Sequence, residues 1–195
     1  MNIDIEAALE KVRFYEENDM VFSAMYLWEK IVRLETTEYR KFKYADALRL
    51  CGYFLKSKEI FLSVQPGNIP AQYRYIYFLY FGQLYMDMGD IKMAKASFLQ
   101  CLDYENCDTV PYIFLSNLLN KEDDNWEAIY YLKTALDKEG DTDEVYYNLA
   151  FRLAIIKDFE GALKAINQCL YLSPDYPNAL ALQSDIKNYL SFLSQ

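Results

Sequence analysis

The 195-residue sequence contains no histidine. The common acid–base and nucleophilic arrangements of enzymes mostly depend on an imidazole side chain. The six glycines are scattered along the chain, so the sequence has no glycine-rich phosphate loop either. We therefore expect no enzymatic activity, no catalytic residues and no cofactor.

Glycine and proline are scarce, at 6 and 5 residues, whereas there are 19 Tyr and 12 Phe. Few helix breakers and many long side chains favour helices. The chain is 53% hydrophobic and 17% aromatic, which is enough to bury a large core. No run of about 18 uncharged apolar residues occurs, so we expect no membrane insertion. The opening stretch, MNIDIEAALEK, has no basic region followed by an apolar run, which predicts a cytoplasmic protein without a secretory signal.

Basic residues are outnumbered by acidic ones, 20 to 29, and the net charge is −9. An acidic surface repels phosphates, so we expect no nucleic acid and no anionic membrane as partner. The same charge would attract a basic partner, or serve solubility alone. The four cysteines form no C-x-x-C pair, so we expect no metal site and a reduced compartment.

A pattern recurs at intervals of 34 residues between residues 75 and 176. The small residues Ala94, Ala128 and Ala162 mark its period. Two successive shifts of 34 also align side chains of similar size at six further positions. These sets are Phe78, Tyr112 and Tyr146; Phe81, Leu115 and Leu149; Gly82, Ser116 and Ala150; Tyr85, Leu119 and Leu153; Phe98, Leu132 and Ile166; and Cys101, Ala135 and Cys169.

This pattern resembles the tetratricopeptide repeat, in which W-x2-L-G-x2-Y, then A-x3-F, then P recur in 34 residues. Residues 78–85, FLYFGQLY, fit its first half, residues 89–98, GDIKMAKASF, fit its second half, and Pro174 fits the closing proline. The resemblance implies an all-α, right-handed superhelical solenoid of antiparallel helix pairs. Small residues at the Gly82 and Ala94 positions would allow the two helices of a pair to approach closely.

The pattern persists more weakly upstream, where Gly52 and Asp19 stand at the predicted turns. Two prolines and a glycine in QPGNIPA predict a loop between two repeats. We expect one array of about five helix pairs, closed by a C-terminal capping helix. The repeats are predicted at 5–37, 38–74, 75–108, 109–142 and 143–176, and the capping helix at 177–194.

The stretch EDDNWE, residues 122–127, groups four carboxylates. It lacks the ligand spacing of a calcium loop. We interpret it as a polar turn in which Asp124 or Asn125 caps the next helix.

The resemblance implies a concave groove, lined by the first helix of each repeat, that holds segments of other proteins. Helical geometry assigns to it the second, fifth, sixth, ninth and twelfth residues of each repeat, which do not face the pair's own core. Several of these are apolar, and amides that can bond a peptide backbone lie beside them. The predicted groove residues are Leu79, Tyr80, Gln83, Ile113, Phe114, Asn117, Tyr147 and Asn148.

Three functions are compatible with this reading. The first is a non-catalytic adaptor or chaperone-like scaffold that binds a largely apolar protein or peptide segment in the groove. The second is a structural subunit of a homo-oligomer, such as a homodimer, or of a larger assembly. The third is an acidic inhibitor or immunity partner of a basic protein. Capture of an acidic C-terminus is not expected, because the matching groove positions hold apolar residues or amides, with only Lys43 and Arg49 basic.

The repeat register can be tested by Ala128→Trp. The register places Ala128 where two helices touch, so a large ring should overpack the contact by about 1–3 kcal/mol or more. Lys133→Ala, at a position predicted to face outward, should change stability by no more than about 0.5 kcal/mol. Equal melting temperatures for the two variants would show that the register is wrong.

Overall fold

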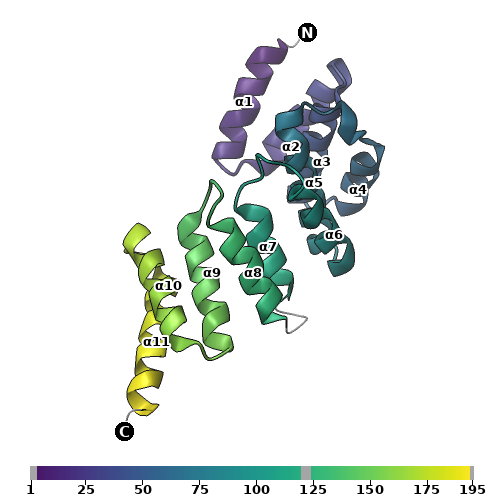
Figure 1. Ribbon diagram of the computed structural model, residues 1–195. Helices are drawn as coiled ribbons and strands as arrows, with labels where there is room; N and C mark the ends of the chain where they lie inside the picture. The colour runs from purple at the N-terminus through teal and green to yellow at the C-terminus, as the bar shows by residue number, and fades with distance from the viewer. Residues whose placement is uncertain (1–3, 120–123, 194–195) are drawn as a thin grey trace. The chain divides into compact units, whose positions relative to one another are not determined.

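The computed structural model describes residues 4–119 and 124–193, and over these ranges the chain is helical with no strand. Figure 1 shows the succession of helices along the chain. This confirms the predicted all-α helical-repeat fold. The helix pairs are α1 (Ile5–Glu17) with α2 (Val21–Leu34), α3 (Glu38–Leu50) with α4 (Phe54–Ser63), α5 (Arg74–Asp87) with α6 (Ile91–Cys101), α7 (Val110–Leu119) with α8 (Asn125–Ala135), and α9 (Thr142–Ile155) with α10 (Phe159–Leu172); α11 (Pro177–Leu193) follows.

The helices fall into two compact units, residues 1–104 with α1 to α6 and residues 105–195 with α7 to α11. The first helix of each pair, and α11, begin within one residue of the starts predicted from the sequence. Residue 194, the predicted end of the capping helix, lies outside the described residues. A single array over the whole chain stays a prediction.

The α5–α6 pair is held together where a small residue on one helix faces a large one on the other, and the second helices of the neighbouring pairs also bury small residues. A Cβ atom added to Gly82 in α5 would lie 2.5 Å from the Phe98 ring in α6, so only glycine fits there. Ala94, Ala128 and Ala162 are fully buried on the second helices. Lys133, on the same helix as Ala128, is exposed. The structure thus places these residues as the register requires.

The turns inside the pairs use the left-handed backbone region that glycine favours. Asp19, Gly52 and Gly89 have φ angles of 54°, 81° and 77°, as expected for the turn positions predicted there. In the α9–α10 turn the same position holds Lys157, with φ 65°. The N–H of Lys157 donates to the carbonyl of Ala154 at 3.0 Å, which closes the end of α9.

Aspartates begin several second helices. The Asp124 carboxylate accepts a hydrogen bond from the N–H of Glu127 at 3.1 Å, which confirms the capping interpretation of the acidic stretch. Asp90 and Asp158 cap α6 and α10 in the same way. The other two acidic residues of that stretch, Glu122 and Asp123, lie outside the described residues.

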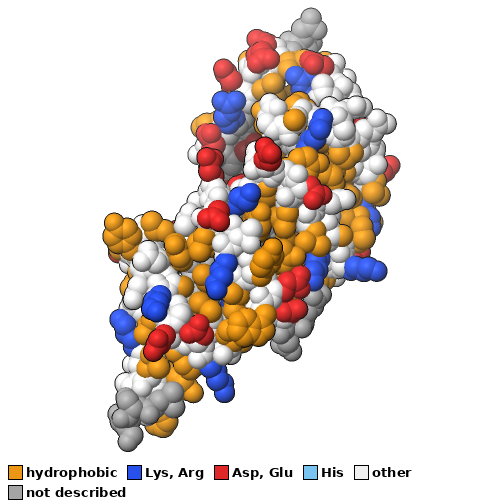
Figure 2. Space-filling model, viewed as in Figure 1, with side chains coloured by type: hydrophobic (Ala, Val, Ile, Leu, Met, Phe, Trp, Pro, Cys, Tyr) orange, Lys and Arg blue, Asp and Glu red, His pale blue; other side chains and the backbone are white. Residues whose placement is uncertain are grey.

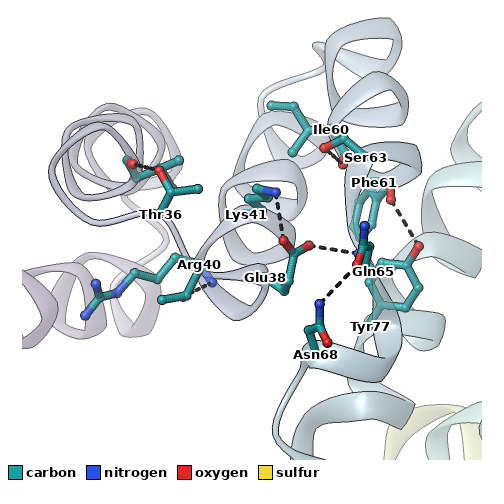
Figure 3. Close-up of polar contacts among 12 residues, drawn as sticks. Thr36, Glu38, Arg40, Lys41, Ile60, Phe61, Ser63, Gln65, Asn68 and Tyr77 are labelled. Atoms are coloured by element: carbon teal, nitrogen blue, oxygen red, sulfur yellow. Dashed lines mark hydrogen bonds and ion pairs between the residues drawn. The ribbon is translucent and has the colours of Figure 1, made fainter.

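The predicted loop between α4 and α5 is fixed to α3 by a carboxylate (Figure 3). It contains only two short 3₁₀ turns, Pro66–Asn68 and Ala71–Tyr73. Glu38 accepts hydrogen bonds from the Lys41 ammonium and from the N–H of Gln65, both at 2.8 Å. Nearby, the Tyr77 hydroxyl donates to the carbonyl of Phe61 at 3.1 Å, so α5 is bonded to the end of α4.

Lys157→Gly should stabilise the protein. A non-glycine residue in the left-handed region carries a conformational cost that glycine avoids, so we expect the free energy of unfolding to rise by about 0.5–1 kcal/mol. The reverse change, Gly89→Lys, is the matched control. A Cβ atom at Gly89 would meet nothing within 4 Å, so any loss of stability in Gly89→Lys reflects backbone strain alone. Denaturant unfolding measures both, and unchanged values would contradict this account of the turns.

Glu38→Gln should remove a pH-dependent part of the stability. Burial raises the pKa of Glu38, but the hydrogen bonds from Lys41 and Gln65 outweigh it and lower the pKa below its usual 4.5. Because the pKa of Glu38 is lower in the folded state than in the unfolded state, its ionised form stabilises the fold above pH 4.5. This stabilisation is lost as the pH falls through the folded-state pKa. We expect Glu38→Gln to cost about 1 kcal/mol at pH 7 and progressively less in acid. Glu59 on α4 is exposed, so the difference in stability between Glu59→Gln and the wild type should not depend on pH in this way.

Candidate protein-binding surface

In the first unit, the predicted groove residues lie on α5. Tyr80 and Gln83 are half-buried, which leaves part of each side chain accessible. The Tyr80 ring lies 6.2 Å from the ring of Phe42, measured between centroids, and 5.5 Å from the Lys43 ammonium. Burial raises the pKa of Tyr80, so its hydroxyl stays protonated and can donate a hydrogen bond near neutral pH. Leu79 differs from expectation, because it is only 7% exposed and offers little surface to a partner.

In the second unit, the predicted groove residues lie on α7 and α9. Ile113, Phe114 and Tyr147 are half-buried, and Asn117 is exposed. The Tyr147 ring packs 5.2 Å from that of Tyr176, between centroids, which fixes its orientation. Along the same helix, Phe151 and Ile155 are exposed. The predicted set did not include these two residues, although the spacing of α9 placed Phe151 at a groove position.

Asn148, also predicted as a groove residue, serves the structure of α9 instead. It is 7% exposed, and its amide nitrogen donates to the Glu144 carbonyl at 2.8 Å and to the Glu144 carboxylate at 2.9 Å. The same carboxylate accepts a hydrogen bond from the Tyr176 hydroxyl. Burial, followed by this bond to Glu144, raises the pKa of Tyr176. The Asn148 amide is therefore occupied within the protein rather than presented as an exposed donor.

Arg152 is a buried cation of the second unit that the sequence analysis missed. It is 2% exposed, and its guanidinium donates to the carbonyl of Ser116 at 2.6 Å and to the Asn125 side chain at 3.4 Å. Burial lowers the pKa of Arg152. These bonds join α9 to α7 and to the start of α8. An isolated arginine in a helical pattern normally indicates a solvated position, so the sequence carried no signal for this role.

Ion pairs cross the first helices of the first unit. The Lys43 ammonium on α3 lies 3.2 Å from the Glu16 carboxylate on α1. Arg49, nearly two turns further along α3, bonds Asp46 at 2.8 Å and Asp87 on α5 at 2.9 Å. Only Lys43 and Arg49 were considered in the sequence analysis, as basic groove positions. Both cations are already matched by carboxylates, so this face offers no free basic pair for a terminal carboxylate.

The described residues provide neither of two other kinds of site. Within residues 4–119 and 124–193, no group of three or more Cys, Asp or Glu side chains is placed to hold a metal ion. Across these ranges, no helix combines the length and apolar character needed to cross a bilayer. Figure 2 shows hydrophobic side chains among both acidic and basic ones on the face in view, so neither charge covers it.

The fold and these helix faces define a helical-repeat protein. A sequence model of the tetratricopeptide repeat matches residues 80–106 and 143–176, which include the second helices α6 and α10. The chain thus contains tetratricopeptide repeat sequence at these two places, and its helix pairs have the helical-repeat fold. Among curated proteins, none matches it by sequence.

Solved structures share this fold. The Cut9–Hcn1 hetero-tetramer of the APC/C aligns with a TM-score of 0.73 and 16% identity over 95% of this chain, which spans 37% of the length of that one. YrrB, described as having an unusual peptide-binding site, aligns with a TM-score of 0.64 and 14% identity over 93% of this chain and 92% of its own. The first repeat domain of Spaghetti (RPAP3), bound to the HSP90 peptide SRMEEVD, aligns with a TM-score of 0.56 and 15% identity over 60% of this chain and 93% of its own.

Proposed function

We propose that this protein is a non-catalytic, cytoplasmic adaptor or chaperone-like module that binds a largely apolar protein segment along its first helices. The tetratricopeptide repeat is a protein–protein interaction fold, and that much follows from the family. One observation carries the finer statement. In each unit, first helices keep aromatic or aliphatic side chains partly exposed beside an amide: Tyr80 and Gln83 on α5, and Ile113, Phe114 and Asn117 on α7.

These side chains suit an apolar segment in an extended or helical form. Aromatic rings bury large areas at little entropic cost, and partly exposed rings can lose further surface on binding. The nearby amides can accept and donate hydrogen bonds to a peptide backbone. Leu79 and Asn148 are left out of the contact set, because both are buried. The proposed contact residues are therefore Tyr80, Gln83, Ile113, Phe114, Asn117 and Tyr147, with Phe151 added.

The structural comparisons support this class of function. YrrB is described as having a peptide-binding site, and the first repeat domain of Spaghetti as bound to an HSP90 peptide. The acidic peptide on Spaghetti differs from the segment proposed here. An acidic peptide terminus would need basic side chains without a carboxylate partner. On the described first helices of the present chain, the corresponding groove positions hold apolar side chains or cations that are already paired.

A structural subunit remains the second candidate, and a specific observation favours it. Large hydrophobic side chains are also exposed away from the first helices of the five pairs. Trp126 on α8 is 71% exposed, and Tyr171 on α10 is 81% exposed. Extensive exposed apolar surface in a protein commonly marks a contact with another chain. This candidate predicts a stable homo-oligomer or assembly that buries these second-helix residues.

The double substitution Tyr80→Ala with Phe114→Ala tests the proposed surface. The probe is a set of acetylated, amidated apolar peptides selected against the wild-type protein, with affinities measured by calorimetry. If either ring is a hot spot, the double variant should lose about 2 kcal/mol or more of binding, close to thirtyfold. Because both rings are only half-buried, the loss of folding stability should be smaller.

The matched control is Trp126→Ala with Tyr171→Ala, which removes two rings from second helices. The control should bind the selected peptides like the wild type. If the control loses binding and the first-helix variant retains it, the binding surface lies on the second helices. If the first-helix variant unfolds while its folded fraction binds normally, Tyr80 and Phe114 are core residues and the proposal fails.

A further inference from the structure

A groove of the second unit lies between the second helices α8 and α10, where both pack against α9. Its volume is about 480 Å³, and pockets that bind ligands commonly measure roughly 300–1,000 Å³. Its lining residues on α9 are Tyr146, Leu149 and Leu153, none of which belongs to the contact surface proposed above. The groove is therefore a separate surface of the same unit.

The wall of this groove is mostly apolar. Leu149, Leu153 and Ala165 line it and are largely covered by the neighbouring helices, and Tyr146 is half-buried beside them. The groove stays open to solvent along one side. It therefore suits a few apolar side chains that project from a partner, rather than a ligand that must be enclosed on all sides.

Two lysines line the same groove. Lys133 on α8 and Lys164 on α10 are both exposed. Among the described residues, neither ammonium group takes part in an ion pair or a hydrogen bond. The carboxylate of Asp158 also lines the groove, but it caps α10 by accepting a hydrogen bond from the N–H of Gly161 at 2.9 Å. Two unmatched cations thus face one apolar groove, in a chain whose net charge is −9.

The first unit shows what stands at the corresponding position. Glu29 on α2 and Lys133 on α8 are each the ninth residue of their helix, in repeats of the same register. Glu29 lies 3.9 Å from the Lys56 ammonium on α4, which in turn lies 5.5 Å from the Tyr44 ring on α3. A carboxylate and an ammonium group therefore meet between the second helices of the first unit. In the second unit both helices carry lysine, so a carboxylate from a partner would complete the pairing that Glu29 makes in the first.

We propose that this groove binds a segment of a partner protein in which a glutamate or aspartate is flanked by leucine-sized apolar residues. The carboxylate lies between the ammonium groups of Lys133 and Lys164, and the neighbouring apolar side chains cover Leu149 and Leu153. Complementarity to two cations above an apolar wall requires both an anion and apolar surface. Nucleic acid supplies only the anion, whereas a protein segment supplies both. The inference does not depend on the proposed function, because the two surfaces share no residue.

The first experiment compares peptides that differ in one charge. Acetylated, amidated peptides of leucine and serine carry glutamate, glutamine or lysine at each position in turn, and calorimetry measures their affinities. At one or more positions, glutamate should bind the wild type about tenfold more tightly than glutamine, as expected for a charge-assisted hydrogen bond, and lysine more weakly than either. Lys133→Gln with Lys164→Gln should remove this preference, and either change alone should reduce it to about threefold.

Two further variants serve as controls. Lys187→Gln on α11 removes an exposed lysine of the same unit that does not line the groove, so it should retain the full preference. Gln168→Glu places an anion at the groove wall, one turn from Lys164, so it should weaken binding of the glutamate peptide and leave the glutamine peptide unchanged. Because these side chains are exposed, the variants should fold like the wild type, which circular dichroism checks.

The second experiment reports on the groove directly. Methyl NMR cross-peaks of Leu149 and Leu153 follow the groove wall, and those of Leu79 in the first unit serve as the reference. The acetylated, amidated tripeptide Leu-Glu-Leu should shift the first set and leave the reference in place. The tripeptide Leu-Gln-Leu should shift neither at the same concentration. The shifts should disappear in Lys133→Gln with Lys164→Gln, and each single variant should weaken them.

The outcomes separate this inference from its alternatives. Equal binding of the glutamate and glutamine peptides at every position would overturn the groove assignment and leave the proposed function intact. A glutamate preference that survives the loss of both Lys133 and Lys164 would show that the anion binds elsewhere and would also overturn it. Laurate that shifts the same two leucine cross-peaks, when the tripeptide does not, would assign the groove to a fatty acid instead. Tyr80→Ala with Phe114→Ala should leave the glutamate preference unchanged, so failure of the first-helix surface would not affect this test.

Discussion

The close approach of the two helices in each pair is the constraint on which the rest of this structure depends. In the α5–α6 pair, the Phe98 ring occupies the space that a side chain at Gly82 would need. In the other strongly patterned pairs, Ser116 and Ala150 take the place of that glycine and are fully buried. Close packing of this kind leaves little tolerance for added volume. It therefore fixes which face of each helix is core, and with it which face remains for binding.

The same constraint explains why aromatic side chains can remain partly exposed on first helices without leaving the core incomplete. The small and large residues that recur at 34-residue intervals pack in the contact between the two helices of a pair. Tyr80, Ile113 and Phe114 lie outside that set, so the fold does not require them where they are. Apolar side chains that the core does not need are costly to expose. The proposed partner segment would cover them.

Much of the fold could be predicted from the sequence, because helix starts, turns and small contact residues follow from local chemistry and a fixed period. The candidate surface was harder to predict. Leu79 and Asn148 occupy groove positions by spacing, yet both are buried, since burial depends on neighbouring helices that the period does not describe. Arg152 carries no local sign that it bonds the Ser116 carbonyl. Lys157 adopts a backbone conformation that its residue type disfavours, because the turn around it requires that conformation.

The two units use the polar groups of their first helices in different ways. On the first helices of the first unit, cations and carboxylates are matched across α1, α3 and α5. On the second unit, the polar groups of α9 are used internally, by the bonds of Glu144 with Asn148 and Tyr176 and by the burial of Arg152. What remains accessible there is mainly apolar: Phe114, Tyr147 and Phe151. The exposed surface of the proposed contact helices is therefore mainly apolar in the second unit, whereas the charged groups of the first unit are paired with one another.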